Sequence, residues 1–335
     1  MKIALVEAGH WHAPLYLDGL KEDGIEVVAV SDREGRQGAR IAAELGARSY
    51  QSWQQLLANE AVDFAFAFGR PVDMPAIGAA LIAAGVPFAM EKPCGTSLAE
   101  VEALASSARA RDHFVAVPFL YRFGPLREVL ARLEGALPAR FHHMSFRFIG
   151  GPPVRYLENG CPWMLDAAQS GGGAMMNLGG HFVDLFALLS GESVAVVTAA
   201  MSDRAWGAGI EDYAVATLRG TGGALATIEA GYTFPSDGSA LREFSFTLRS
   251  ARCYVMSASG GIRVRPVARG GEAEAAIAVE LGNERYYPIF VADTLARFRA
   301  GEAPACGLGE AVEVMRVMEL AYRSAAAGGA LLETG

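Results

Sequence analysis

The first 118 residues alternate short apolar runs with segments of helical periodicity, and this alternation restricts the fold of that half of the chain most strongly. The apolar runs lie at residues 1–6, 26–30, 62–68, 86–90 and 113–119. One helical segment between them opens with Ser97 and Glu100 in the spacing of a capping box. Strands that alternate with helices are typical of a parallel sheet. We therefore predict an α/β domain over residues 1–119.

Beyond about residue 120 the pattern changes to strands in succession, with Gly or polar turns between several of them. Such a succession predicts a largely antiparallel sheet. A helical segment at 171–191 interrupts the strands, and another at 309–329 closes the chain. We expect residues 120–335 to form a second domain of the α+β class, with a large, mostly antiparallel open sheet.

The composition supports two folded domains and excludes some classes of partner. A chain of 335 residues, 52% hydrophobic and 20% charged, has enough apolar material for two cores. The formal charge of −8 comes without a Lys/Arg cluster that could follow a phosphate backbone, so we expect no nucleic-acid partner. The most apolar run, at 76–90, is broken by Gly85 and Pro87 and is too short for a bilayer. We expect no membrane partner either.

The cysteines and the N-terminus suggest a cytoplasmic protein. The cysteines are scattered, without the spacing of a zinc site or the density of a disulfide scaffold; they are Cys94, Cys161, Cys253 and Cys306. The N-terminus lacks a basic region followed by a cleavage site. His10 and His12 form the one His-x-His pair, but no third ligand with suitable spacing accompanies them, so we expect no metal.

The loop after the first apolar run, at residues 7–12, lies where a dinucleotide-binding domain carries Gly-x-Gly-x-x-Gly. The three glycine positions hold Glu7, Gly9 and His12, so only the middle glycine is present. The setting of strand, turn and helix is nevertheless the one that faces a helix N-terminus toward phosphates. We expect the loop to bind a dinucleotide through Gly9 and the backbone of His10 and Trp11.

The second apolar run ends at Asp32, about twenty residues past the glycine loop. An acidic residue at this place binds the adenosine ribose hydroxyls of NAD. Its alternative role is to cap a helix or a turn. Arg33 beside it could accept a 2′-phosphate, so we expect NAD as the cofactor, with NADP possible.

Glu91, Lys92 and Pro93 follow the apolar run at 86–90, at the edge of a parallel sheet where ligands bind. A lysine there can have a lowered pKa and hydrogen-bond a reacting oxygen, which makes Lys92 a catalytic candidate. The alternative is a solvated Glu-Lys turn. A cis peptide before Pro93 would fix a tight turn in such a loop.

Asn177, His181 and Asp184 lie along one face of the helical segment at 171–191. Three glycines precede them and permit a close approach of another backbone or of a ligand. The alternative interpretation is that His181 is a satisfied core histidine on an apolar helix.

Six motifs occur in the order and spacing of the glucose-fructose oxidoreductase, inositol dehydrogenase and rhizopine catabolism (Gfo/Idh/MocA) family, which the chain resembles over nearly its whole length. They are EKP at 91–93, RFGP at 122–125, CPWMLD at 161–166, GGGAMMNLGGHFVDL at 171–185, EDYAVATLRG at 211–220 and AYRSAAAGG at 321–329. The resemblance implies a Rossmann domain for NAD or NADP and a second α/β domain whose open sheet often packs in homodimers or homotetramers. It also implies a sugar, polyol or related hydroxylated substrate.

Carried over to this chain, the resemblance places the catalytic lysine at Lys92 and the catalytic histidine at His181. Asn177 stands where the family has an acidic residue; an amide can orient a hydroxyl but cannot accept a proton. The base is then His181 alone, or His181 with Asp184 if that carboxylate points inward. Glu91 and Lys92 are expected to border the cofactor, and Trp163 the substrate.

After the fourth strand the family has Thr-Pro and a histidine, whereas this chain has Gly69, Arg70 and Met74. In the expected strand order Glu7 and Arg70 stand at the same edge, so we expect Arg70 to pair with Glu7 or to face the phosphates.

The leading hypothesis is an NAD(P)-dependent oxidoreductase that moves a hydride to or from a CH–OH carbon of a sugar or polyol. The alternatives are a glycoside hydrolase that uses NAD for transient oxidation and a catalytically silent dinucleotide or sugar sensor.

Overall fold

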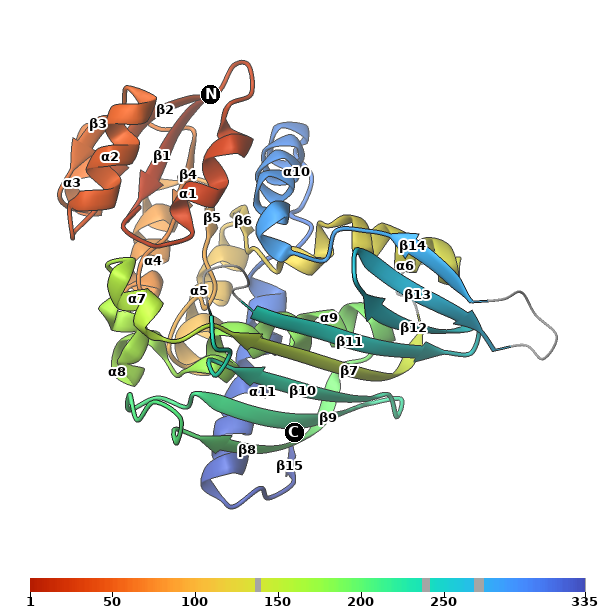
Figure 1. Cartoon of the computed structure of the whole chain (residues 1–335). Coiled ribbons are helices and arrows are strands. Elements are labelled where there is room, and N and C mark those ends of the chain that lie inside the picture. Colours follow the sequence, from red (N-terminus) through yellow and green to blue (C-terminus); the bar gives the residue numbers. More distant parts are fainter. Residues whose placement is uncertain (136–139, 237–241, 268–273, 335) are drawn as a thin grey trace. The chain divides into compact units, whose positions relative to one another are not determined.

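The computed structural model describes residues 1–135, 140–236, 242–267 and 274–334. The chain divides into two compact units, each with its own sheet (Figure 1). The first unit comprises Met1–Leu120, Val154–Gly171 and Glu284–Val312, and the second comprises Tyr121–Pro153, Gly172–Asn283 and Glu313–Gly335. Two segments from beyond residue 120 therefore belong to the first unit.

Six parallel strands form the sheet of the first unit, in the order β3-β2-β1-β4-β5-β6. They are β1 (Lys2–Val6), β2 (Glu26–Ser31), β3 (Arg48–Tyr50), β4 (Phe64–Ala67), β5 (Phe88–Met90) and β6 (Val115–Ala116). Every residue of β4 and β5 is buried, as expected for strands whose two faces are both covered. The strand order reverses between β1 and β4, where Ile3 pairs with Phe64. The predicted parallel α/β domain is confirmed.

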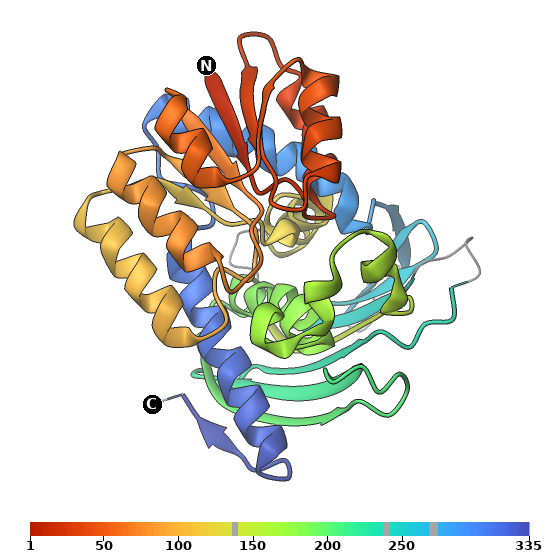
Figure 2. The same cartoon turned by 90° about the vertical axis from the view of Figure 1, so that its left-hand side faces the viewer.

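Helices connect these strands (Figure 2). They are α1 (Ala13–Tyr16), the 3-10 helix η1 (Leu17–Leu20), α2 (Arg36–Leu45), α3 (Trp53–Asn59), α4 (Met74–Ala84) and α5 (Leu98–Ala110). The predicted capping box of Ser97 and Glu100 is present at the start of α5. α2 ends at Gly46 and α4 at Gly85, both at positive φ, where glycine avoids the strain of a side chain.

Later segments complete the first unit. They are α7 (Val154–Glu158), the 3-10 helix η3 (Pro162–Leu165), α8 (Ala167–Ser170) and α10 (Tyr287–Ala300), while η5 (Asn283–Tyr286) and α11 (Leu308–Ala326) each extend into both units. Tyr287 and Phe290 of α10 contact the ring of Tyr16, at centroid distances of 4.9 and 6.0 Å. This aromatic packing accounts for the place of α10 in the first unit.

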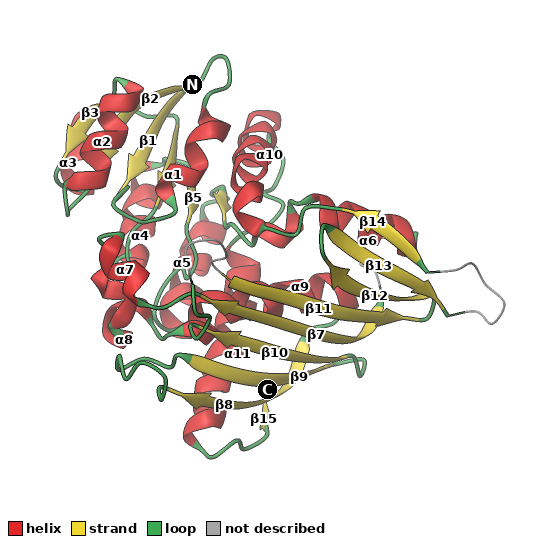
Figure 3. Ribbon diagram, viewed as in Figure 1, coloured by secondary structure: helices red, strands yellow, loops and turns green. Residues whose placement is uncertain are grey.

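The second unit is built on a nine-stranded sheet, in the order β14-β13-β12-β11-β7-β10-β9-β8-β15 (Figure 3). Its strands are β7 (Phe141–Gly150), β8 (Val194–Ser202), β9 (Tyr213–Gly220), β10 (Leu225–Gly231), β11 (Arg242–Ser250), β12 (Cys253–Ala258), β13 (Gly261–Pro266), β14 (Ala275–Ala278) and β15 (Leu332–Glu333). Among the strand pairs that the structure describes here, only β7 and β10 run in parallel. The predicted, mostly antiparallel sheet is therefore confirmed.

Helices cover one face of this sheet (Figure 3). Because only one face is covered, buried residues of β9 alternate with more exposed ones. The helices are η2 (Leu120–Arg122), α6 (Pro125–Glu134), the π-helical turn η4 (Met175–Gly179), α9 (Gly180–Ser190) and part of α11. Phe182 of α9 stacks on Phe146 of β7 and Phe244 of β11, at 5.2 and 6.0 Å between centroids. The helical pattern predicted at 171–191 thus folds as η4 and α9, anchored on the sheet by an aromatic stack.

None of the helices in the described parts of the chain combines the length and the apolar composition that crossing a bilayer requires.

Candidate functional site

The loop after β1 is shaped by one strained residue and one obligatory glycine. Glu7 has a φ of +56°, the left-handed conformation that the first glycine of a dinucleotide loop would adopt freely. A Cβ added to Gly9 would overlap Oδ1 of Asp32, so no other residue fits there without a shift. The backbone of this loop therefore lies directly against the residue that follows β2, as a dinucleotide loop requires.

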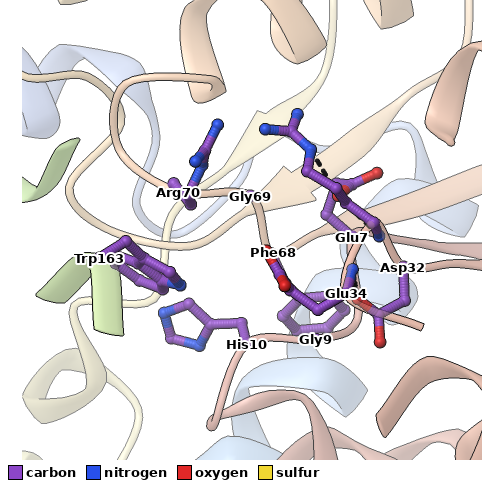
Figure 4. Close-up of a pocket in the computed structure, with 10 residues that line it drawn as sticks. Glu7, Gly9, His10, Asp32, Glu34, Phe68, Gly69, Arg70 and Trp163 are labelled. Carbon is purple, nitrogen blue, oxygen red and sulfur yellow. Dashed lines mark hydrogen bonds and ion pairs between the residues drawn. The ribbon is translucent and has the colours of Figure 1, made fainter. Parts of the chain in front are cut away.

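A pocket of about 320 Å³ opens at this loop (Figure 4). It is lined by Glu7, Gly9, His10, Asp32, Arg33, Glu34, Phe68, Gly69, Arg70 and Trp163. Glu7 and Asp32 stand on one side of it, and His10 and Trp163 on the other. The pocket lies at the carboxyl ends of β1, β2 and β4, where the strand order reverses, which is the usual ligand-binding position in an open parallel sheet. The structure brings together here six residues that the sequence predicts for cofactor or substrate: Gly9, His10, Asp32, Arg33, Arg70 and Trp163.

Asp32 is buried and bonded to the backbone through both carboxylate oxygens. Oδ1 accepts from the N–H of Glu34 at 2.9 Å, and Oδ2 from the N–H of Gly38 at 2.8 Å. The alternative that the sequence left open, a turn and helix cap, is thus present at the start of α2. Each oxygen retains a further lone pair, so a role at the ribose stays a prediction.

The ion pair expected between Glu7 and Arg70 is not formed. Arg70 donates from Nε to Oδ2 of Asp73 and from Nη1 to Oε1 of Gln169, each at 2.6 Å. Glu7 instead accepts from the N–H of Arg33 at 3.3 Å, and the Nε of Arg33 lies 4.0 Å from the same oxygen. The reason is local: Asp73 is three residues from Arg70, and Arg33 follows the strand that pairs with β1.

Burial raises the pKa of the Glu7 carboxyl above its ordinary value, while the N–H and charge of Arg33 oppose that rise. Arg33 is tied on its other side, because its Nη1 lies 3.2 Å from Oδ2 of Asp73. Arg33, Arg70 and the carboxylates of Glu7 and Asp73 therefore form one connected charge network at the rim of the pocket.

Glu91 and Lys92 do not form the solvated turn that was the alternative for this motif. Their exposed fractions are 2% and 7%, and the peptide between Lys92 and Pro93 is cis, as predicted. Oε1 of Glu91 accepts from the hydroxyl of Tyr16 at 2.8 Å, and Oε2 from the N–H of Lys92 at 3.1 Å. The role of Tyr16 was not predicted from the sequence, because Tyr16 lies within the apolar pattern of α1 and resembles a core residue.

The pKa values of Glu91, Lys92 and Cys94 are shifted by burial and by neighbouring charges. Burial lowers the pKa of Lys92 to about 8, although the charge of Glu91 opposes the change. Burial alone would raise the pKa of Glu91, but contact with His12 and the charge of Lys92 hold it below its ordinary range. Burial raises the pKa of the Cys94 thiol, so this cysteine is a small buried filler rather than a nucleophile.

The two loop histidines belong to hydrogen-bonded networks. Nδ1 of His12 lies 3.1 Å from Oε1 of Glu91 and 2.8 Å from the hydroxyl of Tyr287. Nδ1 of His10 accepts from the N–H of His12 at 3.0 Å, which assigns the neutral proton of His10 to Nε2. Burial lowers the pKa of both histidines, which are therefore neutral near pH 7.

A second segment of the first unit packs onto the loop. The ring of Trp163 lies 5.4 Å from that of His10, and Tyr156 meets Trp11 edge-on at 4.8 Å. The guanidinium of Arg155 lies 5.5 Å from the Trp11 ring. Over the residues that the structure describes, no group of three or more His, Cys, Asp or Glu side chains is arranged to hold a metal ion.

Asn177 and His181 are both buried in the second unit, on η4 and α9. Nδ2 of Asn177 donates to the hydroxyl of Tyr232 at 3.1 Å, and the ring of His181 meets Tyr121 edge-on at 6.1 Å between centroids. Tyr232 and Tyr121 were missed by the sequence analysis, since nothing in the local pattern links residues so far apart in the chain.

Asp184 is committed to another partner. Nε of Arg122 donates to its Oδ2 at 2.8 Å, and Nη2 of Arg122 lies 2.8 Å from its Oδ1, a bidentate geometry. The carboxylate of Asp184 is thus held by Arg122, and its role beside His181 stays a prediction. Arg122 belongs to the RFGP motif at 122–125, but the sequence did not predict its ion pair with Asp184.

The glycines before this helix serve a close backbone approach, as predicted. A Cβ on Gly173 would overlap the carbonyl oxygen of Glu211. The carboxylate of Glu211 accepts from the N–H of Gly173 at 2.8 Å, from the N–H of Met175 at 2.9 Å and from the hydroxyl of Tyr322 at 2.6 Å. Glu211 thereby satisfies the free donors at the start of the helix that carries Asn177 and His181.

Lys92 belongs to the first unit, and Asn177 and His181 belong to the second. The structure assembles the surroundings of each, and their convergence on one substrate stays a prediction.

Two family models match the chain. One is described as an oxidoreductase family with an NAD-binding Rossmann fold and matches residues 1–119, and the other is the GFO/IDH/MocA C-terminal domain, at residues 138–255. Together they cover both units' sheets in large part.

Similar proteins with curated names are dehydrogenases or oxidoreductases. A 4-carboxy-2-hydroxymuconate-6-semialdehyde dehydrogenase from Sphingobium sp. is 34% identical over 133 residues, which are 39% of this chain and 42% of that protein. A D-xylose 1-dehydrogenase (NADP(+)) from Haloferax volcanii is 25% identical, with 91% of each chain covered. The chain spans 42%, 52% and 61% of the lengths of the first three curated relatives.

Among solved structures, an oxidoreductase from Agrobacterium radiobacter in complex with NAD+, L-tartaric acid and magnesium has a TM-score of 0.86 and 19% identity. The match covers 100% of this chain and 98% of that one, so the two share their fold throughout.

Proposed function

This chain belongs to the Gfo/Idh/MocA family of oxidoreductases, and we propose that it transfers a hydride between NAD(P) and a hydroxyl carbon of a sugar, polyol or related compound. The relatives' names support a dehydrogenase acting on a small hydroxylated molecule. The first unit, with its NAD-binding Rossmann fold, supports the cofactor.

The pocket at the glycine loop is the place that we assign to the dinucleotide, because a Cβ at Gly9 would overlap Asp32 and Gly9 itself adds no side chain to the loop. We assign cofactor binding to Gly9, the backbone of His10 and Trp11, Asp32, Arg33, Arg70, Glu91 and Lys92. When bound, NAD supplies an acceptor for the hydride at C4 of its nicotinamide ring.

The observation that carries the proposal is the burial of Lys92 at the carboxyl edge of the parallel sheet. Burying an ammonium costs free energy, so a buried lysine at a ligand-binding edge supports a functional role, and burial lowers its pKa to about 8, near the pH at which proton transfer is efficient. Lys92 is the group that would hydrogen-bond the reacting oxygen through Nζ and stabilise its charge.

His181 is assigned as the general base that takes the hydroxyl proton on its imidazole. Asn177, whose amide already bonds Tyr232, would orient the substrate or the imidazole without moving a proton. Trp163, in the pocket wall, would contact the substrate.

The proposal also includes the cellular location and the oligomeric state of the protein. We expect a cytoplasmic enzyme, in keeping with four cysteines that are all free thiols. We expect a homodimer or homotetramer assembled through the open sheet, which size-exclusion chromatography with light scattering would measure.

A panel of sugars and polyols with NAD or NADP, followed by the absorbance of the reduced nicotinamide, tests the proposal. Net formation of reduced cofactor with at least one substrate supports a dehydrogenase. Tight cofactor binding without turnover of any compound would favour a sensor instead.

A further inference from the structure

Glu7 is the most unusual residue of the cofactor pocket. It occupies the first glycine position of the loop at a φ of +56°, a left-handed conformation that is strained for a residue with a side chain. Its side chain is buried and lines the pocket next to Asp32 (Figure 4). A glycine here would relieve the strain, so the retained carboxylate calls for a functional explanation.

Of the two buried carboxylates that line this pocket, Glu7 and Asp32, Glu7 is the one that the chain's backbone satisfies less. Both oxygens of Asp32 accept backbone N–H groups within 2.9 Å. Glu7 accepts the N–H of Arg33 at the longer distance of 3.3 Å, has a weaker interaction with the backbone of Trp53, and makes a weak contact, 3.5 Å, with the hydroxyl of Ser31. It therefore keeps more capacity than Asp32 to accept hydroxyl donors from a ligand.

The cations that could attract a phosphate are already engaged. Arg33 lies between Glu7 and Asp73, at 4.0 and 3.2 Å, and Arg70 is bonded to Asp73 and Gln169. A phosphate ester entering this pocket would compete with these carboxylates for the arginines and would also face the charge of Glu7. A diol would meet neither obstacle.

We propose that Glu7, with Arg33 held between Glu7 and Asp73, makes this site select NAD over NADP. The carboxylate of Glu7 accepts a hydroxyl of the adenosine ribose and repels a 2′-phosphate, a task that sequence reasoning assigned to Asp32. The inference rests on the proposed cofactor role of this pocket.

Calorimetric titration with NAD, NADP, ADP-ribose and 2′-phospho-ADP-ribose at pH 8 tests this without any turnover. The wild type is expected to bind NAD about tenfold or more tightly than NADP. Glu7→Gln keeps the side chain's size and removes its charge, and should tighten NADP binding about tenfold while NAD changes by less than about threefold. The ADP-ribose pair should show the same shift, which places the effect at the adenosine end.

Glu26→Gln is the matched control, because Glu26 is exposed at the opposite end of β2 and its substitution makes the same change in net charge. It should leave the ratio of the two affinities unchanged. Glu7→Gly, which removes both charge and strain, is the second variant should Glu7→Gln fail to fold, and it should shift the ratio in the same direction.

A folded Glu7 variant that binds NAD with an unaltered NAD-to-NADP ratio would overturn the inference and leave the proposed function standing. An equal shift in Glu26→Gln would overturn it too, since the effect would then be one of net charge. A wild-type protein that binds none of the four ligands would overturn the inference and the proposed function together.

Discussion

Two buried charged sites, one in each unit, are built in opposite ways. In the second unit Arg122 and Asp184 form a bidentate pair, with side-chain exposures of 16% and 2%. In the first unit Lys92 is 7% exposed, and its pKa falls to about 8 despite the nearby Glu91. A pair with complete geometry offsets much of its own desolvation, whereas the lowered pKa of Lys92 means that burial disfavours its charged form. The first arrangement is structural, and the second is expected of a group that takes part in a reaction.

The largest effect should come from removing the groups assigned to chemistry. Lys92→Ala and His181→Ala should each lower turnover by about two to four orders of magnitude, the usual loss for a general acid or base. Cofactor affinity should fall much less in His181→Ala. Steady-state kinetics with a substrate from the panel, beside titration with NAD, measures both. Near-normal turnover in both variants would refute the assignment.

Breaking the structural pair should instead act on folding. Asp184→Asn removes the charge that Arg122, whose side chain is 16% exposed, contacts, and should lower the free energy of unfolding by about 1–3 kcal/mol. Urea denaturation measures this, and the double variant Arg122→Met/Asp184→Leu should recover much of the loss because it removes both buried charges. A loss below about 1 kcal/mol in the single variant would contradict the structural interpretation.

The smallest effect sharpens the description of the first site. Since the charge of Glu91 raises the pKa of Lys92, Glu91→Gln should lower that pKa further below about 8. If Lys92 works protonated, the decline of turnover at alkaline pH should begin at a lower pH in the variant, with a several-fold loss at pH 8. A pH profile that superimposes on that of the wild type would separate Glu91 from the function of Lys92.

The contrast between the two sites also marks what the sequence can reveal. The alternation of apolar and helical segments predicted the parallel sheet, and the succession of strands beyond about residue 120 predicted the antiparallel one, because periodicity reports which residues are buried. The place of Lys92 after β5 and the glycines before α9 were likewise local signals. The partner of Asp184 was not, since Arg122 lies 62 residues away in the chain. The expected pair of Glu7 and Arg70 was wrong for a similar reason. Strand order predicts which edge of the sheet a residue occupies, but not whether Arg33 or Arg70 reaches the carboxylate of Glu7.

The sequence also did not predict that residues 154–171 and 284–312 belong to the first unit. The aromatic contacts of Tyr287 with Tyr16 and of Tyr156 with Trp11 depend on tertiary packing alone. No spacing in the sequence encodes contacts across more than a hundred residues.

The central claim is that Lys92 is kept buried for function at the expense of stability. In the unfolded chain a lysine titrates near pH 10.5 and in the folded chain Lys92 titrates near 8, so between these values only the unfolded state binds its proton. The contribution of Lys92 to the free energy of unfolding must therefore be lowest below pH 8 and must rise as the pH increases from 8 to 10.5.

Urea unfolding of the wild type and of Lys92→Met, at pH 7 and at pH 9.5, measures this contribution directly, because the difference between the two proteins cancels the titration of other groups. At pH 7 Lys92→Met should be the more stable by about 1–3 kcal/mol, with turnover lost, and the gap should narrow at pH 9.5. A variant that is less stable than the wild type at pH 7 would contradict the account.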